Sequence, residues 1–201
     1  MSLFTGREEK YKPGMNLNDL LSEKKASIIQ KWFDAIIENY PEDSSHFLKK
    51  QKDRFLNPVG NTISRNIEGL FDQILHDAES EQIYPFLDDI IKIHAVQNFS
   101  PSKAVSFMPL LKPVVRDELG SAITGHTLSA ELRSFEAQID NLTFLSFDIY
   151  MKCRERIFEL RVNEIKTMTF RLLKRANLIS EVEEHESEIT AETVLTQNIK
   201  G

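Results

Sequence analysis

The sequence lacks several features that are typical of secreted and membrane proteins. Its 201 residues include one cysteine, Cys153, which cannot build an internal disulfide framework and therefore favours the cytoplasm. It has no apolar run of about 18 residues, the length that crosses a bilayer. The first residues, "MSLFTGREEKYKPG", lack the basic-then-apolar order of a signal peptide. We therefore expect a cytoplasmic protein without membrane insertion.

Glycine and proline are also few, with seven of each. That is too little for the many tight turns of a loop-rich all-β fold, so helices are favoured. Positive charge is in deficit, because 25 Lys and Arg stand against 31 Asp and Glu. Nucleic acids are bound through Lys and Arg that release counterions. The net charge of −6 therefore predicts no nucleic-acid partner.

Clustered chemical groups are missing as well. Adjacent carboxylates such as Asp88 and Asp89 point about 100° apart on a helix and share no site. Cys153 lies on an apolar stripe, where a small buried hydrophobe is a better interpretation than a nucleophile. No histidines form the i, i+4 helical pair that metal sites use, since they stand at His46, His76, His94, His126 and His185. We therefore predict no catalytic residue, no metal site and no enzymatic activity.

What the sequence has is apolar residues at helical spacing, with apolar and charged fractions of 41% and 28% that fit one globular domain. The first stripe predicts a helix that Asn18 caps and Pro41 stops; it consists of Leu17, Leu21, Ile28, Trp32, Ile36 and Tyr40. In "NPVG", Asn57 and Pro58 predict the cap and first residue of a second helix. Its stripe consists of Val59, Ile63, Ile67, Phe71, Ile74 and Leu75. Gly60 in its first turn indicates close packing against a neighbouring helix.

Two further helices are predicted between residues 83 and 119. In "EQIYPFLDDIIKIHAVQ", one helix face carries Leu87, Ile90, Ile91 and His94. The next helix starts in "NFSPSKAVSF", where Ser100 is the predicted cap and Pro101 the first residue. Pro109 and Pro113 lie inside this helix. Each removes a backbone hydrogen bond, so we expect a kink or a break.

The last helix is the most distinctive element, because no Pro or Gly interrupts residues 129–179. Its predicted core stripe consists of Leu132, Phe135, Ile139, Leu142, Leu145, Ile149, Cys153, Ile157 and Leu160. Further on, we expect a projecting part that binds a partner, often a second copy, through Ile165, Met168, Phe170 and Leu172. Thr167 and Thr169 are candidate phosphate acceptors there. Residues 180–201 are acidic and predict a flexible tail.

His94 is the one candidate cofactor-binding residue. It extends an apolar face that Leu87 and Ile90 begin. A histidine in such a position can ligate haem iron from a helix that lines a pocket. The alternative is a core histidine that a hydrogen bond satisfies, and the sequence leaves both interpretations open.

Three segments together resemble the RsbRD N-terminal domain family, the sensor part of RsbT co-antagonist proteins of bacterial stress signalling. They are "DRFLNPVGNTI", "IIKIHAVQNFSPSKAVSF" and "IDNLTFLSFDIYMKCRERIFELRVNEIK", and the resemblance covers about residues 17–166. It implies an all-α, globin-like domain, typically without haem, that dimerises and passes signals through its last helix. It places His94 on the helix that would carry a proximal haem ligand, where the family commonly has Arg. Family proteins continue into a STAS domain, whereas an acidic tail follows here, so stressosome assembly is not carried over.

These observations divide the chain into an N-terminal arm (1–16), a globin-like sensor domain (17–166) and an acidic tail (180–201). The last helix of the domain is expected to extend to about residue 179. We predict a non-enzymatic cytoplasmic regulatory domain for signal transduction in a stress response, a homodimer that relays a signal to a partner protein through its final helix. The alternative is a haem- or small-ligand-binding globin-type sensor that uses His94.

Overall fold

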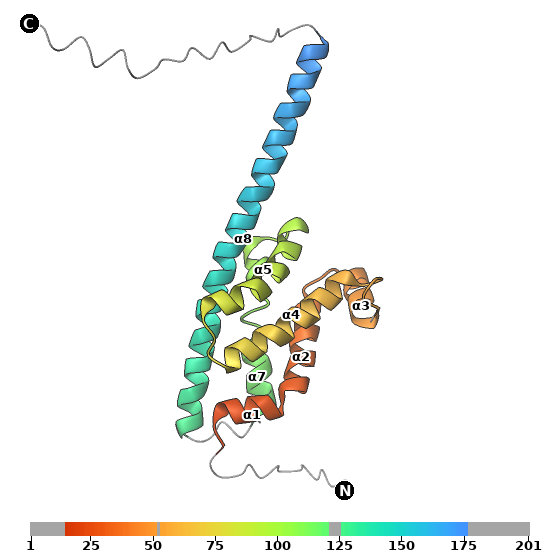
Figure 1. The fold of residues 1–201 in the computed structure, drawn as a ribbon. Coiled ribbons are helices and arrows are strands. Elements are labelled where there is room, and N and C mark those ends of the chain that lie inside the picture. The colour runs from red at the N-terminus through yellow and green to blue at the C-terminus, as the bar shows by residue number, and fades with distance from the viewer. Residues whose placement is uncertain (1–14, 52, 121–125, 177–201) are drawn as a thin grey trace, which may run out of the picture. The chain divides into compact units, whose positions relative to one another are not determined.

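The computed structural model describes residues 15–51, 53–120 and 126–176, and every regular element within them is a helix (Figure 1). The eight helices of these residues are α1 (Leu17–Glu23), α2 (Lys25–Glu38), α3 (Glu42–Lys50), α4 (Pro58–Leu75), α5 (Ser80–Val96), α6 (Pro101–Val105), α7 (Leu111–Leu119) and α8 (His126–Arg175). The predicted all-α fold with a very long last helix is confirmed, since α8 has 50 residues. The chain divides into two compact units, residues 1–158 and 159–201, and each is described by itself.

The first unit is built around one core of apolar side chains. Trp32, Phe71 and Phe107 are the largest fully buried residues. Trp32 Nε1 donates to the Phe107 carbonyl oxygen at 2.6 Å, so the polar atom of the indole is satisfied. α4 and α5 pack along each other, and α2 packs against α4 and α7. Arg116 joins α7 to α8 by donating to both carboxylate oxygens of Glu136, at 2.5 and 2.7 Å.

The start of α4 is as the sequence predicts. Asn57 Oδ1 accepts from the Gly60 backbone N–H at 2.8 Å, and Pro58 is the first helical residue. Asn57 Nδ2 also donates to the carbonyl oxygens of Leu48 and Gln51, at 2.9 and 2.8 Å. The sequence predicts close packing of Gly60 against a neighbouring helix, but the three atoms nearest to a Cβ at this position all belong to the Asn57 side chain, within 3.0 Å. Gly60 therefore leaves room for the cap of its own helix.

The first predicted helix differs in its start and in its continuity. Its N-cap is Asn16 and not Asn18, because Asn16 and Asp19 form a capping box in which each side chain accepts from the other's backbone N–H, at 2.9 and 3.2 Å. Asn18 lies inside α1 and donates to the Leu75 carbonyl oxygen at 3.0 Å. Lys24 then leaves the helical conformation, with ψ at 5°, and separates α1 from α2.

The segment before α4 contains a helix that was not predicted, whereas the segment after α5 shows the break that its prolines predict. Residues 42–50 form α3, with acidic residues in its first turn and lysines in its last, an order that the helix dipole favours. The helix that follows Pro101 is broken, and Pro109 lies in the break between α6 and α7. Pro113 does not interrupt α7 because it lies in the first turn, where its missing N–H has no helical partner. Ser100 occupies the cap position of α6, but its side chain makes no capping bond.

The first unit buries one face of α8. Of the predicted core stripe, Leu132, Phe135, Ile139, Leu142 and Ile149 are buried, and Leu145, Cys153 and Ile157 are half-buried. Leu160 was predicted to end this stripe, but it is 56% exposed, so the core stripe ends at Ile157. In the second unit, residues 159–175 are exposed except for the half-buried Val162. This exposure leaves the apolar side chains of the second unit available for an external contact.

Candidate functional site

His94 is buried near the end of α5 and is bonded through one ring nitrogen only. Its Nδ1 lies 2.7 Å from the Ala104 carbonyl oxygen. Because that oxygen can only accept, Nδ1 carries the proton and Nε2 is left as an acceptor. Nε2 and the Tyr40 hydroxyl are both buried without a partner in the described part of the chain. Burial lowers the pKa of His94, so the folded state favours the neutral ring.

Aromatic rings surround His94. Phe99 stacks on the imidazole with ring centroids 4.9 Å apart, and the rings of Tyr40 and Phe107 each lie at 6.0 Å. The unprotonated Nε2 could in principle bind haem iron. An axial histidine bonds the metal through one ring nitrogen while its other ring nitrogen donates a hydrogen bond to the protein, as Nδ1 does here. The surroundings do not suit haem, because protein atoms cover Nε2 so closely that not even a water molecule could touch it. A porphyrin therefore does not fit unless these rings move.

The other residues singled out in the sequence do not converge on a site. Within the described ranges, no group of three His, Cys, Asp or Glu side chains is placed to hold a metal ion. Cys153 is half-buried, and burial raises the pKa of its thiol, which opposes a reactive thiolate. Thr167 and Thr169 are exposed in the second unit, where Thr167 Oγ1 donates to the Asn163 carbonyl oxygen at 2.9 Å. His185 lies outside the described residues.

A second face of α8 carries exposed apolar residues in the first unit. These are Phe144, Phe147, Met151 and Phe158, with exposed fractions of 71, 43, 39 and 69%. Their spacings of three, four and seven residues are those of the a and d positions of a heptad repeat. Sequence reasoning missed this face because its members alternate along the chain with those of the core stripe. The sequence did contain a signal for this face: the segment "NLTFLSFDIYM" has more apolar residues than a single helical stripe can hold.

The second unit continues this spacing in the sequence. Ile165 and Leu172 follow Phe158 at intervals of seven and are 63 and 62% exposed, and Met168 follows Ile165 by three. Phe170 is also exposed but falls outside the repeat. We call the members of the repeat the outer stripe of α8: Phe144, Phe147, Met151, Phe158, Ile165, Met168 and Leu172. Each of the two units thus contributes exposed members to one heptad pattern.

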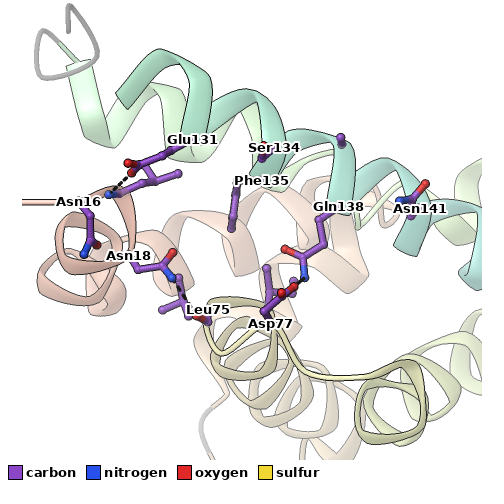
Figure 2. A pocket seen from close by; sticks show the side chains of 12 residues that line it. Asn16, Asn18, Leu75, Asp77, Glu131, Ser134, Phe135, Gln138 and Asn141 are labelled. Carbon is purple, nitrogen blue, oxygen red and sulfur yellow. Dashed lines mark hydrogen bonds between the residues drawn. The ribbon is translucent and has the colours of Figure 1, made fainter. Parts of the chain in front are cut away.

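A cleft of about 680 Å³ opens in the first unit, in the size range of small-molecule sites (Figure 2). One side is formed by successive turns of α8, which contribute Glu131, Ser134, Phe135, Ala137, Gln138 and Asn141. The other side is formed by the start of α1, the end of α4 and the turn that follows α4, which contribute Asn16, Leu17, Asn18, Ile74, Leu75 and Asp77. We call this the α1–α8 cleft. It contains amide, hydroxyl and carboxylate groups beside apolar side chains.

Hydrogen bonds fix the two carboxylates of the cleft. Glu131 Oε2 accepts from the Leu17 backbone N–H at 2.7 Å, a contact that the dipole of α1 favours at its N-terminus. Asp77 Oδ1 accepts from Gln138 Nε2 at 3.3 Å. The backbone of Asp77 has φ at 49°, in the left-handed region that Asp and Asn tolerate better than most residues. Figure 2 shows Glu131 and Gln138 reaching from α8 toward α1 and toward Asp77.

The fold and these surfaces define an all-helical domain whose long last helix lines a cleft and also exposes an apolar heptad repeat. The chain belongs to the family described as the RsbT co-antagonist protein rsbRD N-terminal domain, whose model matches residues 26–165. The resemblance seen in the sequence is thereby confirmed, and a globin-like architecture is a general attribute of this family. It is a family of stressosome-type signalling sensor domains and not a known family of enzymes.

The chain is also similar to an uncharacterized protein of the archaeon Archaeoglobus fulgidus. The two are 29% identical over 147 residues, which cover 70% of this chain and 83% of that protein. No solved structure matches the chain. Among the described residues, no helix combines the length and the apolar character needed to cross a membrane.

Proposed function

We propose that this chain is a non-enzymatic cytoplasmic sensor or adaptor domain that forms a parallel homodimer through α8 and relays a signal along that helix to a partner protein. Membership of a signalling sensor family supports the general role. The outer stripe of α8 is the single observation that carries the dimer. Its five members at intervals of seven are Phe144, Met151, Phe158, Ile165 and Leu172.

The energetic argument rests on the exposure of these side chains. Each is between 39 and 71% exposed, and full burial of a large apolar side chain contributes about 1.5–3 kcal/mol. A heptad repeat lets two helices insert such residues into each other as knobs into holes. The spacing fits a helix partner better than a flat surface, because a seven-residue repeat remains on one side of a supercoiled helix.

Two arginines in the repeat should lower the stability of the dimer. Arg154 and Arg161 occupy d positions, where an apolar residue would be most stabilising. Arg154 is turned toward its own domain, since its Nη1 donates to the Ala95 carbonyl oxygen at 3.2 Å and to Asn98 Oδ1 at 2.7 Å. Polar residues at such positions lower stability and select one register. A dimer of moderate stability suits a relay, because a small difference in free energy can shift its packing.

Sedimentation equilibrium of the full chain tests the proposal. Ile165→Asp places a charge inside the proposed helix pair, and burial of an unpaired charge costs several kcal/mol. We expect the dissociation constant of the dimer to rise by at least about 100-fold, which corresponds to about 2.7 kcal/mol. Phe170→Asp is the matched control, since it changes a residue outside the repeat that is also exposed, at 51% against 63% for Ile165, and it should leave the dimer intact. A compact monomer for the unmodified chain would overturn the proposal.

A further inference from the structure

We propose that the α1–α8 cleft binds a small organic cation with two or more amino groups, a diamine or polyamine. This inference rests on the proposed function. It adds the chemical class of the signal that the sensor receives. Six of the cleft residues lie on α8, the helix proposed to relay the signal. A ligand in this cleft would therefore touch the start of the relay helix directly.

The charge of the lining selects a cation. Asp77 and Glu131 are the charged residues among those that line the cleft, and no Lys, Arg or His accompanies them there. Neither carboxylate forms an ion pair within the described part of the chain. An anionic ligand would meet like charge with no compensation, which costs affinity. An ammonium group would instead form charge-assisted hydrogen bonds.

Both carboxylates retain hydrogen-bonding capacity. A carboxylate offers about four lone-pair sites. One oxygen of Glu131 accepts from the Leu17 N–H, and one oxygen of Asp77 accepts from Gln138 Nε2. These bonds hold each group at its own side of the cleft and leave sites for the donors of a ligand. Two fixed carboxylates on different elements match a molecule with amino groups at both ends.

The rest of the lining favours an organic cation over a metal ion. The described residues contain no group of three His, Cys, Asp or Glu placed for a metal, whereas hard cations such as Ca²⁺ require six to eight oxygen ligands. Leu75 is half-buried and offers apolar surface to a methylene chain, and the buried side chains of Phe135 and Ile74 also line the cleft. Ser134 and Asn141 add hydroxyl and amide groups that can hydrogen-bond to further amines.

Isothermal titration calorimetry of the full chain tests the inference with 1,4-diaminobutane and spermidine as probes and 1,4-butanediol as the uncharged analogue. We expect one saturable event with the amines and none with the diol. Asp77→Asn should raise the dissociation constant about tenfold or more, because it removes a charge while Asn still tolerates the left-handed backbone. Glu131→Gln is the second test variant, and it keeps an acceptor for the Leu17 N–H. Asp148→Asn is the matched control, since it removes an exposed charge of α8 outside the cleft.

Three results would overturn the inference: no saturable binding of either amine at millimolar concentration, equal binding of the diol, or an equal loss of affinity in Asp148→Asn. Sedimentation of the same samples separates this inference from the proposed function. A dimer that binds neither amine would overturn the cleft assignment alone. A monomer that binds them would overturn the proposed dimer alone.

Discussion

His94 makes the stability of the first unit sensitive to acid. Burial lowers its pKa in the folded chain, whereas an unfolded chain binds a proton at histidine near pH 6.5, roughly its ordinary pKa. Below about pH 6.5 the unfolded state therefore holds a proton that the folded state lacks. The free energy of unfolding should fall as the pH drops through this range, by up to about 1.4 kcal/mol per pH unit from this one group.

Urea unfolding of the unmodified chain and of His94→Leu between pH 7 and pH 5 measures this effect. The variant should lose less stability over this interval than the unmodified chain, because its buried side chain does not titrate. His46→Gln is the control, since His46 is exposed and the variant should retain the original pH dependence. Parallel profiles for the unmodified chain and His94→Leu would contradict the assignment.

An absorption spectrum tests whether His94 holds haem. Protein atoms cover Nε2, and Phe99, Phe107 and Tyr40 surround the ring. We therefore predict that protein expressed with adequate haem supply shows protein absorbance alone. A near-stoichiometric Soret band that disappears in His94→Ala would show that these rings move aside for a porphyrin.

The sequence predicts the burial of single residues better than it predicts their partners. His94 shares a face with Leu87 and Ile90, and all three are buried. Its ring contacts come from Tyr40 and Phe107, which no local spacing connects to it. The α1–α8 cleft escaped prediction for the same reason, because its two sides come from distant parts of the chain.

At the scale of the helices, Asn57 connects the end of α3 to the start of α4. It is 3% exposed, and its side chain takes part in three hydrogen bonds. Asn57→Ala should lower the free energy of unfolding by about 2–4 kcal/mol, because it removes a cap and leaves buried acceptors unpaired. Asn57→Asp keeps the capping oxygen but loses the two amide donors, so urea unfolding should give it an intermediate stability. An unchanged stability for Asn57→Ala would contradict this role.

The helices that the sequence predicts well are those with a strong local signal. Asn57 and Pro58 mark the start of α4, and one buried face marks its body. α3 gave no such signal, because Leu48 is its only buried residue. The break at Lys24 also went unpredicted, since no Gly or Pro marks it and the apolar spacing continues across it. Leu160 shows the limit of spacing alone, because it extends the core pattern in sequence but is 56% exposed.

In the molecule as a whole, the proposed function depends on α8. Its first turns line the α1–α8 cleft, and its outer stripe runs in sequence from Phe144 to Leu172. Backbone hydrogen bonds link every turn of a continuous helix. A change in how one part of α8 packs against a second copy therefore limits how the rest of the helix can pack. The proposed relay therefore depends on homodimerisation through the outer stripe.

Disulfide cross-linking at single introduced cysteines measures that contact most directly. In a Cys153→Ala background, Ile165→Cys places a thiol on the outer stripe, and Phe170→Cys places one outside it at a similar exposure. Equivalent a positions face each other in a parallel helix pair, close enough for a disulfide bond. We predict that oxidised Ile165→Cys forms a covalent dimer in high yield while Phe170→Cys remains largely monomeric. Equal cross-linking at both positions, or none at either, would contradict it.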